Sequence, residues 1–207
     1  MHNFYIPLTS FKIDLDRIRH ELATYVRPEE GGYAITTSKQ LASDVDYDFS
    51  QFNGITYPDA NGVRTFPSGE TDTDLVFYPK VLEGSYIQSV EQMVSSYLGL
   101  SSPRIRISKF IGGVGAHKIN YLDFHTDPHT PYRVHIALTV MPNVYWKFKT
   151  NEQEYKIHQP ADGVPVLIEV AETAHAVTIP FGSVRYHIWF QYHKPVSSEI
   201  LNRLLNN

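Results

Sequence analysis

A histidine, an aspartate two positions later and a distant second histidine are the residues of this chain best suited to chemistry. They are His125, Asp127 and His175. Two imidazoles and one carboxylate on one face of an iron ion leave its other positions open, which is the arrangement of non-haem Fe(II) oxygenases. The three residues therefore predict a metal centre suited to oxygen chemistry.

The His-x-Asp pair alone is weak evidence. With 10 His and 22 Asp plus Glu in 207 residues, a histidine followed two positions later by an acidic residue is expected about once by chance. The context adds weight, because residues 119–124 are strand-like and lead into the pair, and because His175 lies in a later strand-like segment. The order and spacing of the His-x-Asp pair and His175 together favour a metal site more than the pair does alone.

Arg185 follows the distal histidine in another strand-like segment. A carboxylate ligand buried beside a metal needs a charge partner. A guanidinium is a planar, two-pronged donor that matches a carboxylate better than a lysine does. Arg185 is therefore the candidate anion clamp of the site.

The elements that must hold these residues are mostly short strands. After residue 103, alternating apolar and polar residues predict eight strands, at 104–110, 117–124, 131–140, 144–149, 153–158, 164–170, 174–179 and 183–192. Eight short strands are typical of a jelly roll, the double-stranded β-helix of cupin-like barrels. We expect a mainly β fold in which the His-x-Asp pair ends one strand and the last two strands carry His175 and Arg185.

Helices are predicted before and after the barrel. The first is capped by Asp14 and ends before Pro28, and its apolar stripe consists of Leu15, Ile18, Leu22 and Tyr25. The second starts at Ser85 and ends at Gly99, and a short third helix covers 197–205.

The region between the first two helices is polar and rich in turn residues. Residues 28–80 contain strand-like pieces at 33–36 and 75–78. They could carry substrate-binding loops or form irregular surface packed on the barrel. We expect a single domain over 1–207, in which helices and loops of 1–103 flank a core barrel at 104–192.

The barrel segment resembles a known family. The residues that carry the resemblance are Arg104-Ile-Arg-Ile-Ser-Lys-Phe-Ile-Gly-Gly, His125-Thr-Asp127, Tyr132-Arg-Val-His-Ile-Ala-Leu138, His175-Ala-Val and Val184-Arg-Tyr-His-Ile188. They are similar to the aspartyl/asparaginyl beta-hydroxylase group of Fe(II)- and 2-oxoglutarate-dependent dioxygenases, which includes some bacterial proline hydroxylases. The resemblance covers residues 104–192 and does not extend to the first hundred.

The resemblance implies a role for each candidate residue. His125, Asp127 and His175 would bind Fe(II), and Arg185 would bind the distal carboxylate of 2-oxoglutarate. Animal members of the group that modify protein domains lack the aspartate, whereas this chain has it. The presence of Asp127 therefore favours the bacterial amino-acid hydroxylases, and it also favours hydroxylation over halogenation.

Two further residues match the Arg-x-His strand of the family, which lies near the co-substrate. They are Arg133 and His135, and an inward-facing polar pair with a structural role is the alternative interpretation. His129 could substitute for a metal ligand, although a loop histidine at the mouth of a cavity is the favoured interpretation. His187 shares a strand face with Arg185 and could line the cavity.

Composition restricts the function further. The formal charge of −4 and the pI near 6.2 give no basic surface for nucleic acid. The absence of cysteine restricts metal ligands to His, Asp and Glu. There is no run of 18 apolar residues and no basic segment followed by an apolar core at the N-terminus, so we expect a cytoplasmic protein without a membrane partner.

The function implied is hydroxylation of an amino acid or a peptidyl side chain of Asp, Asn or Pro type. It would use dioxygen and 2-oxoglutarate and release succinate and CO2. Two alternatives stay open: a cupin-type metalloenzyme that does not use 2-oxoglutarate, and a non-catalytic jelly roll that binds a ligand. Dependence on Arg185 and 2-oxoglutarate would separate the first from the hydroxylase, and metal binding would separate the second.

Overall fold

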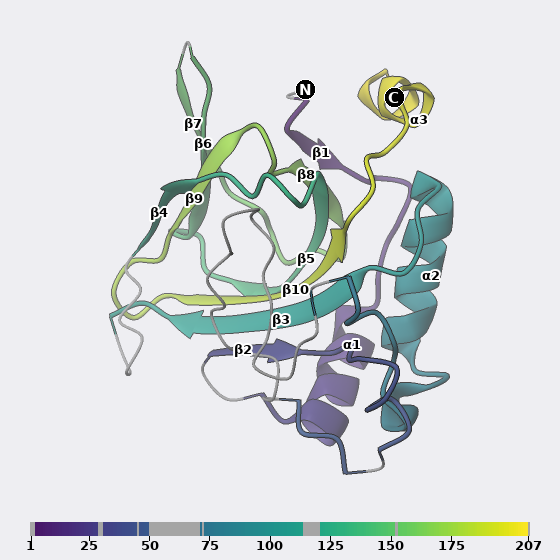
Figure 1. Ribbon diagram of the computed structural model, residues 1–207. Coiled ribbons are helices and arrows are strands. Elements are labelled where there is room, and N and C mark those ends of the chain that lie inside the picture. Colours follow the sequence, from purple (N-terminus) through teal and green to yellow (C-terminus); the bar gives the residue numbers. More distant parts are fainter. Residues whose placement is uncertain are drawn as a thin grey trace.

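The protein consists of two β-sheets that face each other, with helices on the outer side of the larger sheet (Figure 1). The computed structural model describes residues 3–28, 31–44, 46–49, 71, 73–113, 121–151 and 153–206, without the side chains of residues 31 and 121–123. Statements about the structure below concern this part of the chain.

All eight predicted barrel strands have a counterpart. They are β3 (Arg104–Ile111), β4 (Tyr121–His125), β5 (Tyr132–Val140), β6 (Tyr145–Lys149), β7 (Glu154–Ile157), β8 (Val166–Glu169), β9 (Ala174–Thr178) and β10 (Val184–Tyr192). The first residues of the strand predicted at 117–124, residues 117–120, lie outside the described residues.

The strand order is that of a jelly roll. The larger sheet has the order β1-β8-β5-β10-β3-β2 and the smaller sheet has the order β4-β9-β6-β7, with antiparallel pairs throughout. The eight barrel strands are divided equally between the two layers, and consecutive strands lie in different layers except for the hairpin of β6 and β7. Strands β1 (Tyr5–Pro7) and β2 (Gly31–Ala34) extend the larger layer. The predicted fold class is confirmed.

Alternation along β10 separates two environments. Ile188, Phe190 and Tyr192 belong to a large apolar core between the larger sheet and the helices. The side chains at the intervening positions are also buried but point between the two sheets, and they are Arg185, His187, Trp189 and Gln191. A second apolar core, which includes Trp146 and Phe148 of β6, also lies between the sheets.

Helix α1 (Leu15–Glu21) begins as predicted, because the Asp14 side chain accepts a hydrogen bond from the Arg17 N–H. It continues as a π-helical turn, Leu22–Val26, whose wider spacing shifts the buried side by one residue. Val26 is therefore buried and Tyr25 is 43% exposed. The prediction that Tyr25 completes the apolar stripe was wrong.

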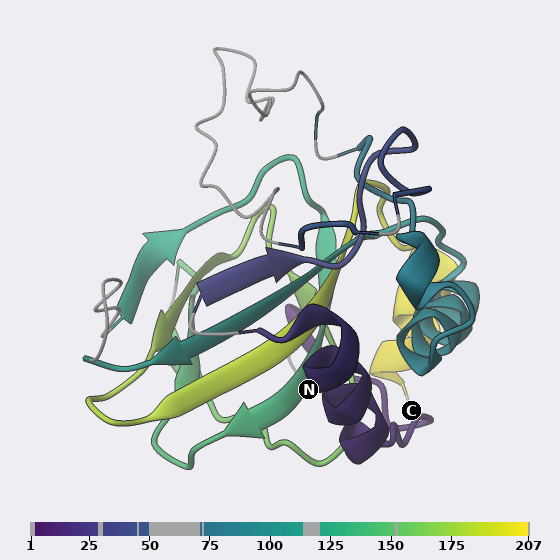
Figure 2. The same cartoon turned by 90° about the horizontal axis from the view of Figure 1, so that it is seen from below.

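Helices α2 (Tyr86–Leu98) and α3 (Ser198–Leu205) also match their predicted positions. Ser85 caps α2 by accepting from the Gln88 N–H, and Gly99 ends it in the left-handed conformation at φ 64. Helices α1 and α2 pack on the outer face of the larger sheet, away from β4, β9, β6 and β7 (Figure 2).

The N-terminal region departs most from the prediction. Strand β1 was not predicted, and β2 is shifted by two residues from the strand-like piece at 33–36. The piece at 75–78 forms only one bridge, between Thr37 and Phe77, so a strand there was a wrong prediction. Residues 50–70, part of the region 28–80 that could carry substrate-binding loops, lie outside the described residues.

No helix in the described part of the chain is both long and apolar enough to cross a membrane.

Candidate functional site

The two histidines of the predicted triad are neighbours across the smaller sheet. His125 is the last residue of β4 and His175 is the second of β9, and the two are paired in register. Their ring centroids are 4.4 Å apart. Register between two strands thus brings together residues that lie far apart in the sequence.

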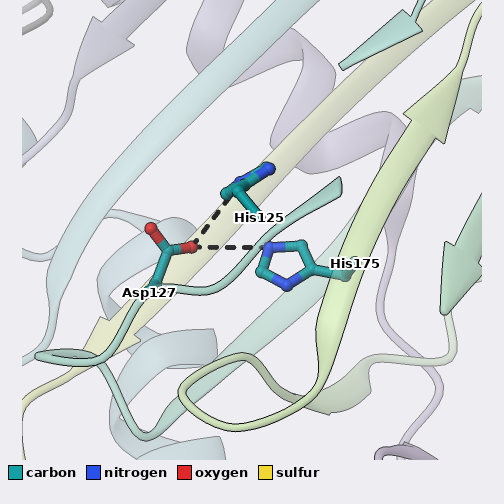
Figure 3. Close-up of side chains that lie close together, drawn as sticks. All are labelled: His125, Asp127 and His175. Atoms are coloured by element: carbon teal, nitrogen blue, oxygen red, sulfur yellow. Dashed lines mark ion pairs between the residues drawn. The ribbon is translucent and has the colours of Figure 1, made fainter. Parts of the chain in front are cut away.

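Asp127 completes the cluster two residues past the end of β4. Its Oδ2 lies 3.4 Å from His175 Nε2 and 3.9 Å from His125 Nε2 (Figure 3). One ligand atom from each of the three residues lies within 4.8 Å of the others. His175 and Asp127 are buried, whereas the His125 side chain is 42% exposed, so the cluster is open to solvent on one side.

The donor set fits a divalent transition metal. Nitrogen and carboxylate ligands lie about 2.0–2.2 Å from such an ion, so adjacent donors around it are roughly 3 Å apart. The two distances from Asp127 Oδ2 to the histidine nitrogens, 3.4 and 3.9 Å, exceed that value by less than about 1 Å. Three donors on one side leave the remaining positions for other ligands.

The backbone N–H and the backbone carbonyl of Asp127 are both hydrogen-bonded. Its N–H donates to the Val170 carbonyl at 2.7 Å, and its carbonyl accepts from the Thr130 N–H at 2.8 Å. The second bond closes a turn in which Pro128 occupies the second position, where its fixed φ is favourable. The position of the carboxylate is therefore set before any metal binds.

Arg133 compensates the charge of this carboxylate. Its Nη1 lies 2.7 Å from Asp127 Oδ2, and both side chains are largely buried. Burial raises the pKa of Asp127, but the Arg133 guanidinium, together with His175 and His125 in their protonated forms, outweighs it and holds the pKa well below its usual range. Asp127 is therefore an anion at any pH at which the histidines could bind metal.

The orientation of His175 also suits ligation. Its Nδ1 lies 3.2 Å from the Thr173 carbonyl oxygen, which can only accept, so Nδ1 carries the proton. Nε2 is then left with a lone pair directed at Asp127. This is the tautomer that a metal-binding imidazole requires.

Arg185 lies deeper between the sheets and has no anionic partner. It is 4% exposed, its guanidinium carbon is 4.6 Å from the centre of the Trp146 ring, and it forms no hydrogen bond or ion pair within the described part of the chain. Burial lowers its pKa to about 9, so it is still a cation at neutral pH. A buried cation of this kind can pair with an anion.

His135 and His187 lie beside Arg185 and are almost fully buried. Their ring centroids are 5.9 Å apart, and among the described residues no hydrogen-bond partner is found for either ring nitrogen of either side chain. Burial lowers the pKa of both, with Arg185 adding to the effect, so both are neutral. Each neutral ring can donate one hydrogen bond and accept another. We call Arg185, His135 and His187 the inner polar layer.

Trp146 of β6 connects the metal cluster with the inner polar layer. Its ring is 6.3 Å from that of His175 and 4.8 Å from that of His135. The indole N–H donates to Gln159 Oε1 at 3.1 Å, and the Gln159 amide donates to the His135 carbonyl at 3.0 Å. The ring is therefore fixed as an apolar wall that excludes water from this space.

Trp146 and Gln159 were not among the site residues predicted from the sequence. Alternation along 144–149 places Val144, Trp146 and Phe148 on one buried face, and that pattern could have identified the tryptophan. No signal in the sequence identifies Gln159, since its role depends on a contact with a different strand.

A second tryptophan lies nearer the open side of the barrel. The Trp189 ring has the Arg106 guanidinium carbon 5.0 Å and the Arg133 guanidinium carbon 4.7 Å from its centre, and it stacks on His135. Arg133 also forms the ion pair with Asp127, so this tryptophan lies next to the metal cluster.

The remaining candidate is separate from the cluster. His129 is exposed in the turn after Asp127 and is not among the potential ligand group found in the described residues.

Comparisons with known proteins found similar folds among solved structures. No family model and no curated protein matches the chain. Among solved structures, it is similar to an oxidoreductase of the 2OG-Fe(II) oxygenase family from Burkholderia pseudomallei, with a TM-score of 0.50 and 13% identity, covering 88% of this chain and 79% of that one. It is also similar to a prolyl hydroxylase from Trichoplax adhaerens, solved with a hypoxia inducible factor peptide fragment, with a TM-score of 0.48 and 12% identity over 92% and 84% of the two chains. At such identities the first similarity establishes a shared fold.

Proposed function

We propose that this protein is an Fe(II)- and 2-oxoglutarate-dependent dioxygenase that hydroxylates an amino acid or a peptidyl side chain. The observation that carries the proposal is a potential three-donor metal cluster in the same inter-sheet space as a buried arginine without an anionic partner. Iron, when bound with 2-oxoglutarate, supplies the oxygen chemistry, with succinate and CO2 as co-products. The jelly-roll fold supports the proposal, since solved oxygenases of this kind share it.

Each residue of the proposed site has a defined task. His125, Asp127 and His175 hold the metal, and the fixed tautomer of His175 keeps its lone pair available. Arg185 pairs with the distal carboxylate of 2-oxoglutarate and so compensates a charge that would otherwise be buried alone.

The other polar groups of the space orient the co-substrate. His135 and His187 have ring nitrogens that 2-oxoglutarate oxygens can satisfy. Arg133 lies beside the metal carboxylate, where it can contact the end of 2-oxoglutarate nearer the metal. Trp146 keeps water out, which strengthens every one of these charge interactions.

The charges at the open side favour a substrate that carries a carboxylate. Arg106 and Arg133 flank Trp189 next to the metal cluster, so an acidic group entering there meets two guanidinium groups and an apolar ring. This supports a free amino acid or an acidic side chain over a neutral peptide segment. Hydroxylation of Asp, Asn or Pro is the form of the reaction that we propose.

A cupin-type metalloenzyme that does not use 2-oxoglutarate is the competing function. It would use the same metal ligands but has no need of a buried cation at the position of Arg185. The unpartnered guanidinium therefore favours the 2-oxoglutarate-dependent enzyme.

The deciding experiment is an anaerobic titration of the Fe(II)-loaded protein with 2-oxoglutarate, followed by visible absorption. We expect the weak charge-transfer band of a chelated 2-oxo acid in the wild type and none in His175→Ala. If metal binds and no band forms, the 2-oxoglutarate-dependent function is wrong and the cupin alternative replaces it. If no metal binds, a ligand-binding jelly roll is favoured.

A further inference from the structure

One short turn contacts both buried members of the metal cluster. Residues 170–173 connect β8 to β9, and the Val170 carbonyl accepts the Asp127 N–H at 2.7 Å. At the other end of the turn, the Thr173 carbonyl accepts the Nδ1 proton of His175 at 3.2 Å. The direction of two carbonyl groups in one turn therefore sets the position of Asp127 and the tautomer of His175.

A single carboxylate holds this turn in shape. Glu169, the last residue of β8, accepts the N–H groups of Ala171 and Glu172 through Oε1 and that of Thr173 through Oε2, each at 2.8 Å. Hydrogen bonds to an ionised acceptor are stronger than those between neutral groups. Three of them on one side chain leave the backbone of the turn little freedom.

We propose that Glu169 is a positioning residue of the metal centre. By closing the turn it fixes the Val170 and Thr173 carbonyls, and through them it keeps the Asp127 carboxylate and His175 Nε2 in ligating orientation. The inference rests on the proposed function only in taking the cluster as a metal site. Glu169 itself is not among the potential ligands found in the described residues.

The physical effect of losing Glu169 follows from the chain of hydrogen bonds. Without it, the Thr173 N–H loses its acceptor and the Thr173 carbonyl is free to turn away from His175. The neutral imidazole then distributes its proton over both nitrogens, and a proton on Nε2 blocks ligation. Partners that orient metal-binding histidines in this way typically contribute about 10- to 100-fold to metal affinity.

The test compares Glu169→Gln with Glu172→Gln. In the first variant the amide cannot accept at every position that the carboxylate serves, so at least one backbone donor of the turn faces an N–H₂ group. Glu172 is exposed, lies in the same turn, and its side chain forms no hydrogen bond or ion pair in the described part of the chain. The two variants remove the same charge, and only one breaks the turn.

Metal affinity is measured by competition with a chelator, using Co(II) alone as the probe. We expect Glu169→Gln to bind Co(II) about 10- to 100-fold more weakly than the wild type and Glu172→Gln to stay within about twofold. Glu169→Asp, which keeps the charge but shortens the reach, should fall between them. It replaces Glu169→Gln if that variant does not fold, as judged by circular dichroism.

A second measurement needs no metal. Nitrogen-15 NMR of the His175 ring in the apoprotein should show the Nδ1–H tautomer in the wild type and in Glu172→Gln, and a mixture of tautomers in Glu169→Gln. Unchanged Co(II) affinity together with an unchanged tautomer in Glu169→Gln would overturn the proposal. If the wild type binds no divalent metal, the proposed function fails, and the tautomer experiment still decides whether Glu169 orients His175.

Discussion

The two faces of β10 differ in how completely their side chains are satisfied. On the outer face, Ile188 and Phe190 pack into an apolar core against the helices. On the inner face, Arg185 has no anionic partner and His187 has no hydrogen-bond partner within the described residues, although both are buried. One strand therefore stabilises the fold on one side and carries unsatisfied polar groups on the other, which is what a preformed site for a polar ligand requires.

We therefore expect substitutions on the inner face of β10 and among the metal-cluster residues to weaken the binding of metal or 2-oxoglutarate. Substitutions on the outer face of β10 should lower the stability of the fold. The largest effect on binding should come from His175→Ala, which removes a buried ligand and should abolish metal binding and turnover. The apoprotein should lose only about 1 kcal/mol of stability, because one hydrogen bond is lost. Isothermal titration with Co(II) and urea unfolding measure the two quantities. Retained succinate production in this variant would remove His175 from the site.

Phe190→Ala should produce the largest loss of stability. Its ring is fully buried in the outer core, and truncating such a ring costs about 3–5 kcal/mol. Urea unfolding of the apoprotein gives the value. Under conditions in which the variant is still folded, its Co(II) affinity should equal that of the wild type, because no inner-face group has changed. Weakened metal binding by the folded variant would show that the two faces are not separable.

Arg133→Met should destabilise the apoprotein by about 3 kcal/mol at neutral pH, because it leaves the Asp127 carboxylate buried without its cation. The folded-state pKa of Asp127 lies below its ordinary value. The ion pair therefore contributes stability above about pH 4 and this contribution is lost as the pH falls through the folded-state pKa. The difference between variant and wild type should shrink in acid.

Urea unfolding between neutral and acidic pH checks this dependence. Lys149→Met is the matched control, since it removes one positive charge from an exposed position of the barrel. A destabilisation that does not change with pH would mean that Arg133 acts through packing alone.

Arg185→Met should weaken 2-oxoglutarate binding on the order of 10²-fold, since the carboxylate loses a buried partner. Arg185→Lys should lose less, because the charge survives and the planar fork does not. Without ligand, Arg185→Met should stabilise the protein by about 1–2 kcal/mol, because an unpaired buried cation is replaced by an apolar side chain of similar length. Thermal unfolding with and without 2-oxoglutarate tests both effects. A destabilised apoprotein would indicate that the guanidinium is already satisfied.

The sequence predicted those parts of the fold that depend on local patterns. Short strand-like segments separated by turn residues located all eight barrel strands, because strand propensity and turn chemistry act over a few residues. Side-chain caps at Asp14 and Ser85 located the starts of the first two helices, because a cap acts within one turn. The His-x-Asp pair and the distal histidine were identifiable because metal ligands are restricted to a few residue types.

The tertiary structure decided everything that depends on contacts between distant segments. Register between β4 and β9 places His125 beside His175, and the connection from β4 in one sheet to β5 in the other places Asp127 beside Arg133. The lack of an anionic partner for Arg185 and the contact of the Glu169 turn with Asp127 have no local signal in the sequence. The chain thus specifies which residue types are present and which way each strand faces, whereas only the packed sheets determine which of those side chains meet and which stay unsatisfied.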